Sequence, residues 1–392
     1  MKFETGDMNF NLPTRLVFGW GKINDIGSIC EPFGKHALLV TMKELPYAEK
    51  VSDRLQSSGI KTTLFGDCEP EPSIEGIDQG WGVLEDGHYD FIIALGGGSV
   101  IDTAKTFRIL NAAGGSAWDY TMEMGDSRRP VPDDLIPLIA APTTAGTGAE
   151  VTWNAVVTNK SLKKKAPIRD PLNFPTIALV DPELTLTMPP KVTAATGFDA
   201  FTHAHECFFG SKELSPLAHQ LCLTGMQMVV DNLETAIQEP DNRQARSFLS
   251  WASTQAGLLV GAIEMTGESA VHIFGLPIGA NAGLAHGEAL AITVGPITRY
   301  HTRKNPMRGR ELMELFGIDT KGIADGELEN HLSNALESWL QRIGLVSTLS
   351  GYGMGSDVID RLLESISLTR IKNSFDPTYT IDDIRKIYEQ CL

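Results

Sequence analysis

The chain has 392 residues, of which 42% are hydrophobic and 21% are charged, a composition typical of soluble globular proteins. This length exceeds that of one ordinary hydrophobic core and predicts two or three domains. With 33 basic and 49 acidic residues the formal net charge is −16, which argues against nucleic acid or an anionic membrane as a general partner.

Targeting and redox features favour a cytoplasmic protein. The first twenty residues lack the basic and apolar regions of a secretory signal peptide. The longest apolar runs, such as Phe91–Leu95 and Leu135–Pro142, are about half of the roughly 18 residues that span a bilayer. The five cysteines are odd in number and show no CxxC spacing, which indicates reduced thiols. We therefore expect a cytoplasmic location and no membrane partner.

The first half of the chain alternates apolar strands with helices. Strands are predicted at Ala37–Thr41, Thr62–Phe65, Phe91–Leu95, Leu135–Ala140 and Thr176–Val180, and helices at Ala48–Ser57, at Ser73–Asp86 and from about Val100. Continuous apolar strands separated by helices are typical of a parallel sheet that is covered on both faces. This half therefore predicts an α/β domain.

The second half of the chain shows helical periodicity and no convincing strand pattern. Pro216 behind Ser215 predicts the start of one long helix, and Gln244–Ile263 predicts another. The change in character follows the double proline Pro189-Pro190. We place the domain boundary there, with an α/β domain over residues 1–188 and a helical domain over residues 189–392.

Two glycine-rich loops follow predicted strands in the α/β half. The first is Gly96-Gly97-Gly98-Ser99, and the second, Pro142–Gly148, combines threonines with two glycines. Glycines allow a ligand to approach the backbone closely, and the N-terminus of a following helix binds a pyrophosphate. Each loop alone is also consistent with a tight strand–helix turn. Two of them at successive strand ends favour a nucleotide site, although neither is the G-x-G-x-x-G fingerprint.

The helical half contains one carboxylate and three histidines that could hold a metal ion together. Asp199 and His203 are four residues apart and therefore lie on one face of a predicted helix. His272 and His286 follow later in the chain. Such a ligand set suits Fe²⁺, Zn²⁺ or a similar ion. An isolated Asp–His pair is more often a surface pair or a capped core histidine, so the metal interpretation depends on the combination with the two loops.

Over nearly its whole length the sequence resembles the iron-containing (group III) alcohol dehydrogenases. The matching segments, in order, are GGGSVIDTAK (Gly96–Lys105), APTTAGTGAEVT (Ala141–Thr152), ALVDPELTLTMPP (Ala178–Pro190), TAATGFDAFTHAHE (Thr193–Glu206), and His272 with HGEALA (His286–Ala291). The resemblance implies a Rossmann-like N-terminal α/β domain, an all-helical C-terminal domain, and a homodimer or higher homo-oligomer.

The resemblance also implies a reaction and its residues. The reaction is the NAD(P)-linked interconversion of a small alcohol and its aldehyde or ketone, dependent on Fe²⁺ or Zn²⁺. The implied metal ligands, and hence the catalytic residues, are Asp199, His203, His272 and His286. The implied cofactor contacts are Gly97, Gly98, Ser99, Asp102, Thr143, Thr144, Thr147 and Lys165.

The sequence departs from the family pattern at three places. Leu276 stands where many members have a histidine close to the reacting oxygen, so we name no proton-relay residue. Met42 stands where NAD-preferring members often have an aspartate for the ribose 2′-hydroxyl, which leaves both NAD and NADP open. The segment Lys372-Asn-Ser-Phe-Asp lacks the family's Asn-Pro-Arg, which could alter the substrate pocket.

Two other functions are weighed against the dehydrogenase. A dehydroquinate-synthase-like lyase would also use a metal and NAD, but the basic residues of its phosphate-bearing substrate site have no matching motif here. A non-catalytic homologue is suggested by Leu276 and opposed by the retention of all four ligand positions. For the substrate, a small primary alcohol or diol is the default expectation, and an acid-bearing aldehyde such as sulfo- or phosphonoacetaldehyde is the alternative.

Overall fold

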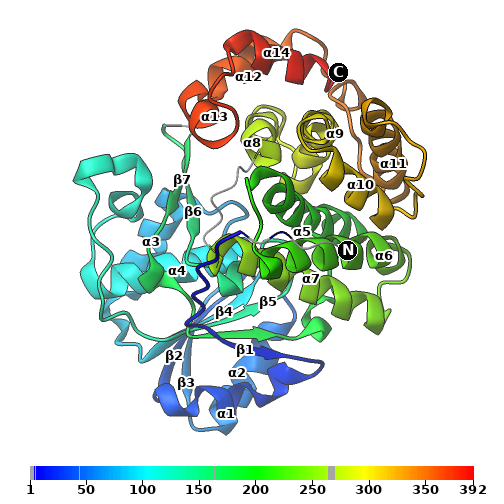
Figure 1. The fold of residues 1–392 in the computed structure, drawn as a ribbon. Coiled ribbons are helices and arrows are strands. Elements are labelled where there is room, and N and C mark those ends of the chain that lie inside the picture. Colours follow the sequence, from blue (N-terminus) through cyan, green and yellow to red (C-terminus); the bar gives the residue numbers. More distant parts are fainter. Residues whose placement is uncertain (1–3, 5, 44, 163, 264–269) are drawn as a thin grey trace. The chain divides into compact units, whose positions relative to one another are not determined.

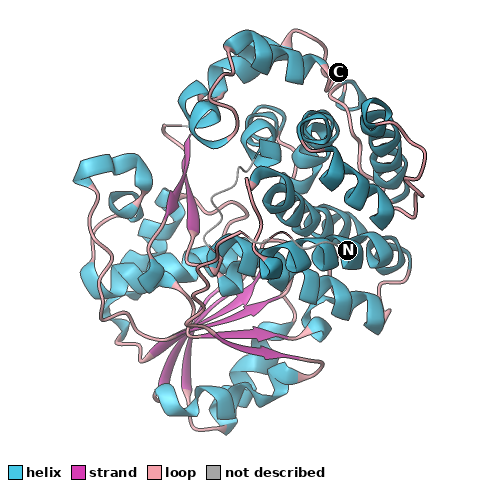
Figure 2. Ribbon diagram, in the orientation of Figure 1, coloured by secondary structure: helices cyan, strands magenta, loops and turns pink. Residues whose placement is uncertain are grey.

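The computed structural model divides into two compact units, Asn11–Met188 and a second unit made of Met1–Phe10 with Pro189–Leu392. It describes residues 4, 6–43, 45–162, 164–263 and 270–392. Figure 1 follows the chain through its elements, and Figure 2 shows that the strands belong to the first unit and that helices make up the second.

Residues up to Phe10, which the sequence analysis assigns to the α/β domain, join the helical unit instead. The Gly6 amide donates to the Leu214 carbonyl at 3.0 Å. Glu4 pairs with the buried guanidinium of Arg308 at 2.5 Å. A buried charge needs such a partner, which explains why the segment is held there.

The first unit contains a six-stranded parallel sheet of order β1-β8-β5-β4-β2-β3 and a separate antiparallel hairpin. The predicted parallel sheet is thus confirmed. The sheet strands are β1 (Arg15–Phe18), β2 (His36–Val40), β3 (Lys61–Phe65), β4 (Phe91–Gly96), β5 (Leu138–Pro142) and β8 (Ile177–Val180), and the hairpin strands are β6 (Ala155–Asn159) and β7 (Lys164–Ile168).

Helices cover both faces of this sheet, because alternate residues of the buried strands point to opposite sides. On one face, Leu39 and Ile93 pack with α1 (Ile26–Cys30) and α2 (Tyr47–Ser57). On the other face, Leu38 and Ile92 pack with α3 (Ile74–Leu84) and α4 (Gly98–Ala113). All six residues of β4 are buried, which is why the sequence shows it as a continuous apolar run.

The second unit contains helices and, among the residues that the structure describes, no strand. Its helices are α5 (Pro190–Gly210), α6 (Pro216–Gln238), α7 (Arg243–Gly261), α8 (Ala270–Ala282), α9 (His286–Lys304), α10 (Pro306–Leu315), α11 (Leu328–Arg342), α12 (Val358–Ser365), α13 (Leu368–Ser374) and α14 (Ile381–Glu389). The predicted start of α6 is confirmed: the Ser215 side chain accepts from the Ala218 amide, and Pro216 occupies the first helical position.

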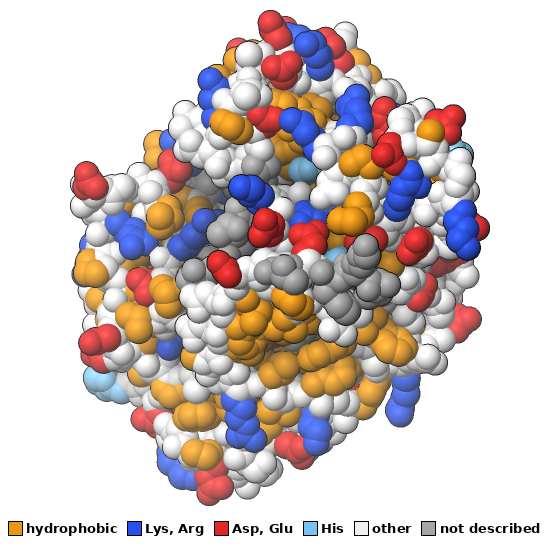
Figure 3. Space-filling model, in the orientation of Figure 1, with side chains coloured by type: hydrophobic (Ala, Val, Ile, Leu, Met, Phe, Trp, Pro, Cys, Tyr) orange, Lys and Arg blue, Asp and Glu red, His pale blue; other side chains and the backbone are white. Residues whose placement is uncertain are grey.

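The molecular surface agrees with the mixed composition. None of the helices in the described ranges is both long and apolar enough to cross a membrane. On the face shown in Figure 3, acidic and basic side chains are interspersed, so the net charge of −16 is not gathered into one patch on that face.

A buried lysine fixes the segment that follows the second glycine loop. Lys105 of α4 is completely buried, and its ammonium donates to the carbonyls of Ala149 and Asn154 at 2.8 and 2.7 Å. It also donates to the Thr152 hydroxyl at 3.2 Å. Burial lowers the pKa of Lys105, and the nearby Asp102 carboxyl opposes that shift. The ammonium therefore links α4 to the chain between the loop and β6.

Replacing this lysine should destabilise the protein. Lys105→Met leaves three buried acceptors without their donor, and we expect the free energy of unfolding to fall by about 3 kcal/mol. Urea denaturation monitored by circular dichroism measures the change. Lys61→Met, at an exposed lysine that begins β3, is the control and should change it by less than about 0.5 kcal/mol. Equal effects of the two substitutions would contradict this role for Lys105.

Candidate metal centre and nucleotide loops

Three helices of the second unit bring a carboxylate and imidazoles together. Asp199 lies on α5, His272 near the start of α8, and His286 at the first position of α9. Oδ1 of Asp199 is 3.3 Å from Nε2 of His272 and 3.6 Å from Nε2 of His286. One ligand atom from each of these residues lies within 4.8 Å of the other two, a spacing that could hold one metal ion.

His203 lies beside this group on the same face of α5 as Asp199. Its Nδ1 is 3.6 Å from Oδ1 of Asp199, and its ring centroid is 4.6 Å from that of His272. It is not part of the tightest three-residue set. Its Nδ1 is buried and has no hydrogen-bond partner among the described residues. A buried polar atom without a partner is costly, so this nitrogen fits a cation that would occupy the group.

The electrostatics of the group also suit a cation. Burial raises the pKa of Asp199, but the imidazoles of His203, His272 and His286 outweigh burial and hold that pKa well below its usual value. Burial lowers the pKa of His203 in spite of the adjacent carboxylate. An ionised carboxylate next to a neutral imidazole is the protonation state in which these side chains bind a divalent metal.

Glu206 is a member of the site that the sequence analysis did not identify. It is buried on α5, and its two carboxylate oxygens lie 2.7 Å from Nδ1 and 2.8 Å from the backbone amide of His272. Burial would lower the pKa of His272, whereas Glu206 and Asp199 raise it to about 10. Because Nδ1 donates to Glu206, Nε2 of His272 is left to face Asp199.

A pattern in the sequence could have revealed Glu206. Asp199, His203 and Glu206 occupy positions i, i+4 and i+7 of one helix and therefore share one face.

On α8, Leu276 lies one turn after His272 and is half-buried. Its side chain has no titratable group, so α8 offers no proton donor or acceptor at that position.

In the first unit the two glycine loops lie side by side. They follow β4 and β5, which are neighbouring parallel strands with Gly96 opposite Pro142. The Thr143 amide donates to the Gly96 carbonyl at 3.0 Å. The N-cap of α4 is Gly97, which has no side chain to accept a hydrogen bond from the first amides of the helix. Its amide groups thus face the same edge of the sheet as the second loop.

The contacts between the loops explain two of the glycines. A Cβ atom on Gly97 would lie 3.1 Å from the Thr144 side chain, and one on Gly98 would lie 2.9 Å from the Thr147 side chain. Both distances are shorter than ordinary carbon contacts, so any side chain here would push the threonines away. The structure thus brings six predicted contacts together: Gly97, Gly98, Ser99, Thr143, Thr144 and Thr147.

The other two predicted contacts already have protein partners. Asp102 accepts from the Val156 amide of β6 at 3.0 Å, and burial raises its pKa. Lys165 of β7 lies 2.5 Å from the Glu71 carboxylate. Neither arrangement tests whether these two residues contact a cofactor, and both assignments stay predictions.

A carboxylate lies close to Met42, just beyond the end of β2. Met42 forms an isolated bridge with Asp67, which follows β3. Asp67 pairs with the ammonium of Lys43, and both side chains are largely exposed. The carboxylate near Met42 is therefore that of Asp67, in the segment after β3, and Lys43 partly neutralises its charge.

Comparisons with known proteins agree with this architecture. Residues 13–182 match the family described as iron-containing alcohol dehydrogenase, and residues 193–392 match the C-terminal part of the Fe-containing alcohol dehydrogenase family. A choline dehydrogenase of Bacillus subtilis (strain 168) is 32% identical over 365 residues, which cover 92% of this chain and 88% of that protein.

Two solved structures are similar over essentially the whole chain. An archaeal halo-thermophilic alcohol dehydrogenase from a Red Sea brine pool has a TM-score of 0.88 with 28% identity and full coverage of both chains. A sulfoacetaldehyde reductase from Bifidobacterium kashiwanohense, solved with NAD⁺, has a TM-score of 0.84 with 29% identity and covers 100% of this chain and 99% of that one. With matches of this extent in both halves, the chain belongs to the iron-containing alcohol dehydrogenase family.

Proposed function

We propose that this chain is a metal-dependent, NAD(P)-linked dehydrogenase that interconverts a small primary alcohol and its aldehyde. The observation that carries the proposal is the buried Asp199 carboxylate with three imidazoles around it, one of them held by Glu206. In this assignment the α/β unit, residues 1–188 of the predicted division, binds the nucleotide, and the helical unit from residue 189 binds the metal.

The metal would be held by Asp199, His203, His272 and His286. One carboxylate and three imidazoles suit Fe²⁺ or Zn²⁺, and the unpartnered Nδ1 of His203 supports a ligand there. A divalent ion acts as a Lewis acid on a substrate oxygen. Glu206 holds one proton of His272 on Nδ1, so that an ion binding at Nε2 would displace only the proton that faces Asp199.

The nucleotide would lie along the two glycine loops. The backbone of Gly97 and Gly98 and the open N-terminus of α4 support binding of a pyrophosphate. The nicotinamide supplies the hydride chemistry. Because Met42, two residues after β2, stands in place of a carboxylate, we propose that the site can take NAD or NADP.

Substrate, location and assembly are further parts of the proposal. The names of the choline dehydrogenase and the sulfoacetaldehyde reductase refer to a primary alcohol and to an acid-bearing aldehyde, so both classes belong in a substrate panel. All five cysteines are free and buried, which supports a reducing compartment such as the cytoplasm. We propose a homodimer or higher homo-oligomer on the family resemblance alone.

The test is metal-dependent turnover followed at the absorbance band of the reduced nicotinamide. Purified protein is loaded with Fe²⁺ or Zn²⁺ and assayed with NAD or NADP on alcohols, and in reverse on aldehydes. We expect turnover that a chelator removes and that either metal restores. Silence across the panel, with metal and nucleotide both bound, would favour a lyase that uses the nicotinamide transiently, whereas silence without bound metal would favour a non-catalytic homologue.

His272→Ala should abolish metal retention and turnover in the same assay while the chain stays folded. The substitution removes an imidazole from the tightest part of the group. Metal content by elemental analysis and the thermal midpoint are the readouts. His331→Ala, at an exposed histidine of α11, is the control and should keep both metal and activity. A metal-free but active H272A protein would refute the metal assignment.

Glu206→Gln should weaken metal binding without removing a ligand. The new amide would present an N–H to Nδ1 of His272 or lose the bond to the His272 backbone, and either change disfavours the tautomer that frees Nε2. We expect about 10- to 100-fold weaker affinity in a chelator competition. Glu337→Gln, at an exposed glutamate of α11, is the matched control. Unchanged affinity in E206Q would mean that Glu206 does not orient the imidazole.

Gly98→Ala should weaken nucleotide binding because the added methyl group pushes Thr147 away from α4. A displacement of this size typically costs about 1–3 kcal/mol, which is about 5- to 150-fold in the dissociation constant of NADH or NADPH. Gly82→Ala on α3 is the control, since its methyl group would meet no atom within 4 Å. Equal binding by G98A and G82A would argue against a nucleotide at the first loop.

A further inference from the structure

The loop between β3 and α3 contains a residue in an unfavourable backbone conformation. Glu71 has φ of +55°, and His88 is the other non-glycine residue with positive φ in the described parts of the chain. This left-handed conformation is uncommon for a glutamate and clusters at functional sites when the surroundings maintain it.

Glu71 contacts two of the residues proposed to bind the nucleotide. Its amide donates to Oγ of Ser99 at 3.2 Å, at the start of α4. Its carboxylate lies 2.5 Å from Nζ of Lys165 on β7. One residue thus spans the space between the phosphate-binding helix end and the lysine of the hairpin.

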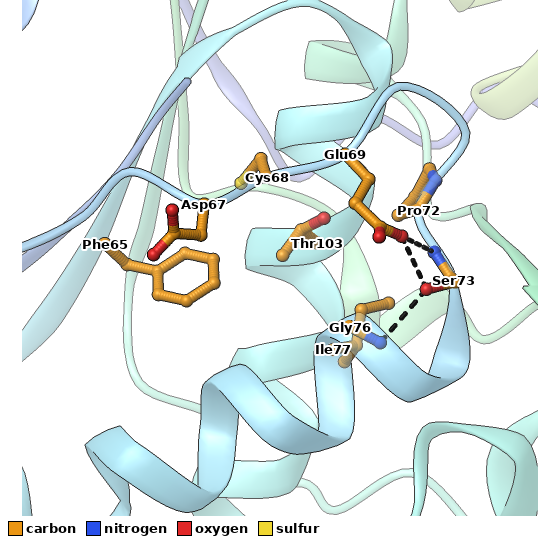
Figure 4. Close-up of a pocket in the computed structure, with 9 residues that line it drawn as sticks. All are labelled: Phe65, Asp67, Cys68, Glu69, Pro72, Ser73, Gly76, Ile77 and Thr103. Carbon is orange, nitrogen blue, oxygen red and sulfur yellow. Dashed lines mark hydrogen bonds between the residues drawn. The ribbon is translucent and has the colours of Figure 1, made fainter. Parts of the chain in front are cut away.

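Neighbouring contacts hold the loop and the hairpin against each other. Figure 4 shows Glu69 turned back onto Ser73, with its carboxylate bonded to the Ser73 hydroxyl and amide. Lys160, the first residue after β6, pairs with Glu69 at 3.0 Å, and the Thr158 amide donates to the Pro72 carbonyl at 2.9 Å. These bonds between the loop and the hairpin therefore help to position Glu71 and Lys165 against each other.

The Glu71–Lys165 pair is open to solvent and to an anionic ligand. The Lys165 side chain is 28% exposed and the Glu71 side chain is 53% exposed. A pyrophosphate at the start of α4 would experience repulsion from the Glu71 carboxylate. It would also compete with that carboxylate for the Lys165 ammonium, because a phosphate oxygen and a carboxylate oxygen bind the same donor.

We propose that Glu71 is an affinity-setting residue of the nucleotide site: its carboxylate occupies Lys165 in place of a phosphate, and a bound dinucleotide has to displace it. The proposal rests on the proposed function, because it takes Ser99 and Lys165 as nucleotide contacts. The contact between Glu71 and Lys165 would therefore lower the affinity for the nucleotide. A lower affinity favours release of the product nucleotide after each turnover.

The experiment compares NADH and NADPH dissociation constants by fluorescence titration of the full-length protein. Glu71→Asn is the main variant, since asparagine tolerates positive φ, keeps the amide that donates to Ser99 and removes the charge. Glu71→Gln is the second variant, which keeps the side-chain length. We expect both to bind the nucleotides about fivefold more tightly at low salt, with a smaller gain at high salt.

Two further variants separate this effect from a general change in charge. Glu75→Gln removes an exposed carboxylate in the first turn of α3, and we expect it to leave the dissociation constants nearly unchanged. Lys165→Met should weaken binding, and Glu71→Asn added to it should bring a smaller gain than in the wild-type background, because the two residues act on each other.

The outcomes distinguish the inference from the proposed function. A wild-type protein that binds neither nucleotide overturns both. A wild-type protein that binds them, with E71N and E71Q binding equally or more weakly at unchanged thermal midpoints, overturns the role of Glu71 alone. In that case the carboxylate either has no influence or contributes a favourable contact to the nucleotide.

Discussion

The candidate metal centre depends on one buried negative charge. Asp199 is only 3% exposed, and the imidazoles around it keep its carboxyl ionised. An isolated charge in such a place would be too costly to bury, so the surrounding helices must supply compensating groups. Glu206 extends this requirement, because it adds a second buried carboxylate that is satisfied through His272. Two anions with imidazoles between them form a group whose charge would suit a cation.

In the α/β unit the corresponding constraint is space rather than charge. The two glycine loops are adjacent because β4 and β5 are adjacent, and the missing side chains of Gly97 and Gly98 leave room for Thr144 and Thr147. The buried ammonium of Lys105 donates three hydrogen bonds to residues 149–154, which follow the second loop. The loops are thus held by strand pairing, by the close approach of the threonines to the glycines and by the bonds of Lys105.

The sequence predicted the features that depend on local patterns. The buried strands of the sheet, the start of α6 and the grouping of Asp199 with His272 and His286 follow from apolar runs, capping residues and family motifs. It did not predict β1, a four-residue strand at the edge of the sheet, or the hairpin, whose second strand begins with lysines and contains a proline. Glu71 was missed because its partners lie far away in the chain, which no spacing within a motif reveals. Glu206 shares a helix face with Asp199 and His203, a spacing that the sequence analysis did not use, and its contact with His272 appears only in the fold.

His286 lies in a less protected place than the other residues of the candidate metal centre. It is the first residue of α9, where helices fray, and its side chain is 37% exposed, compared with 4% for Asp199 and 10% for His272. Two hydrogen bonds close this first turn: the Ala285 amide donates to the Glu288 carboxylate at 2.9 Å, and the Ala289 amide donates to the Ala285 carbonyl at 3.1 Å. Opening of that turn would detach one ligand while α5 and the start of α8 stay folded. Exchange of the ion with its surroundings would therefore begin at the N-terminus of α9, at a rate set by local fraying instead of global unfolding.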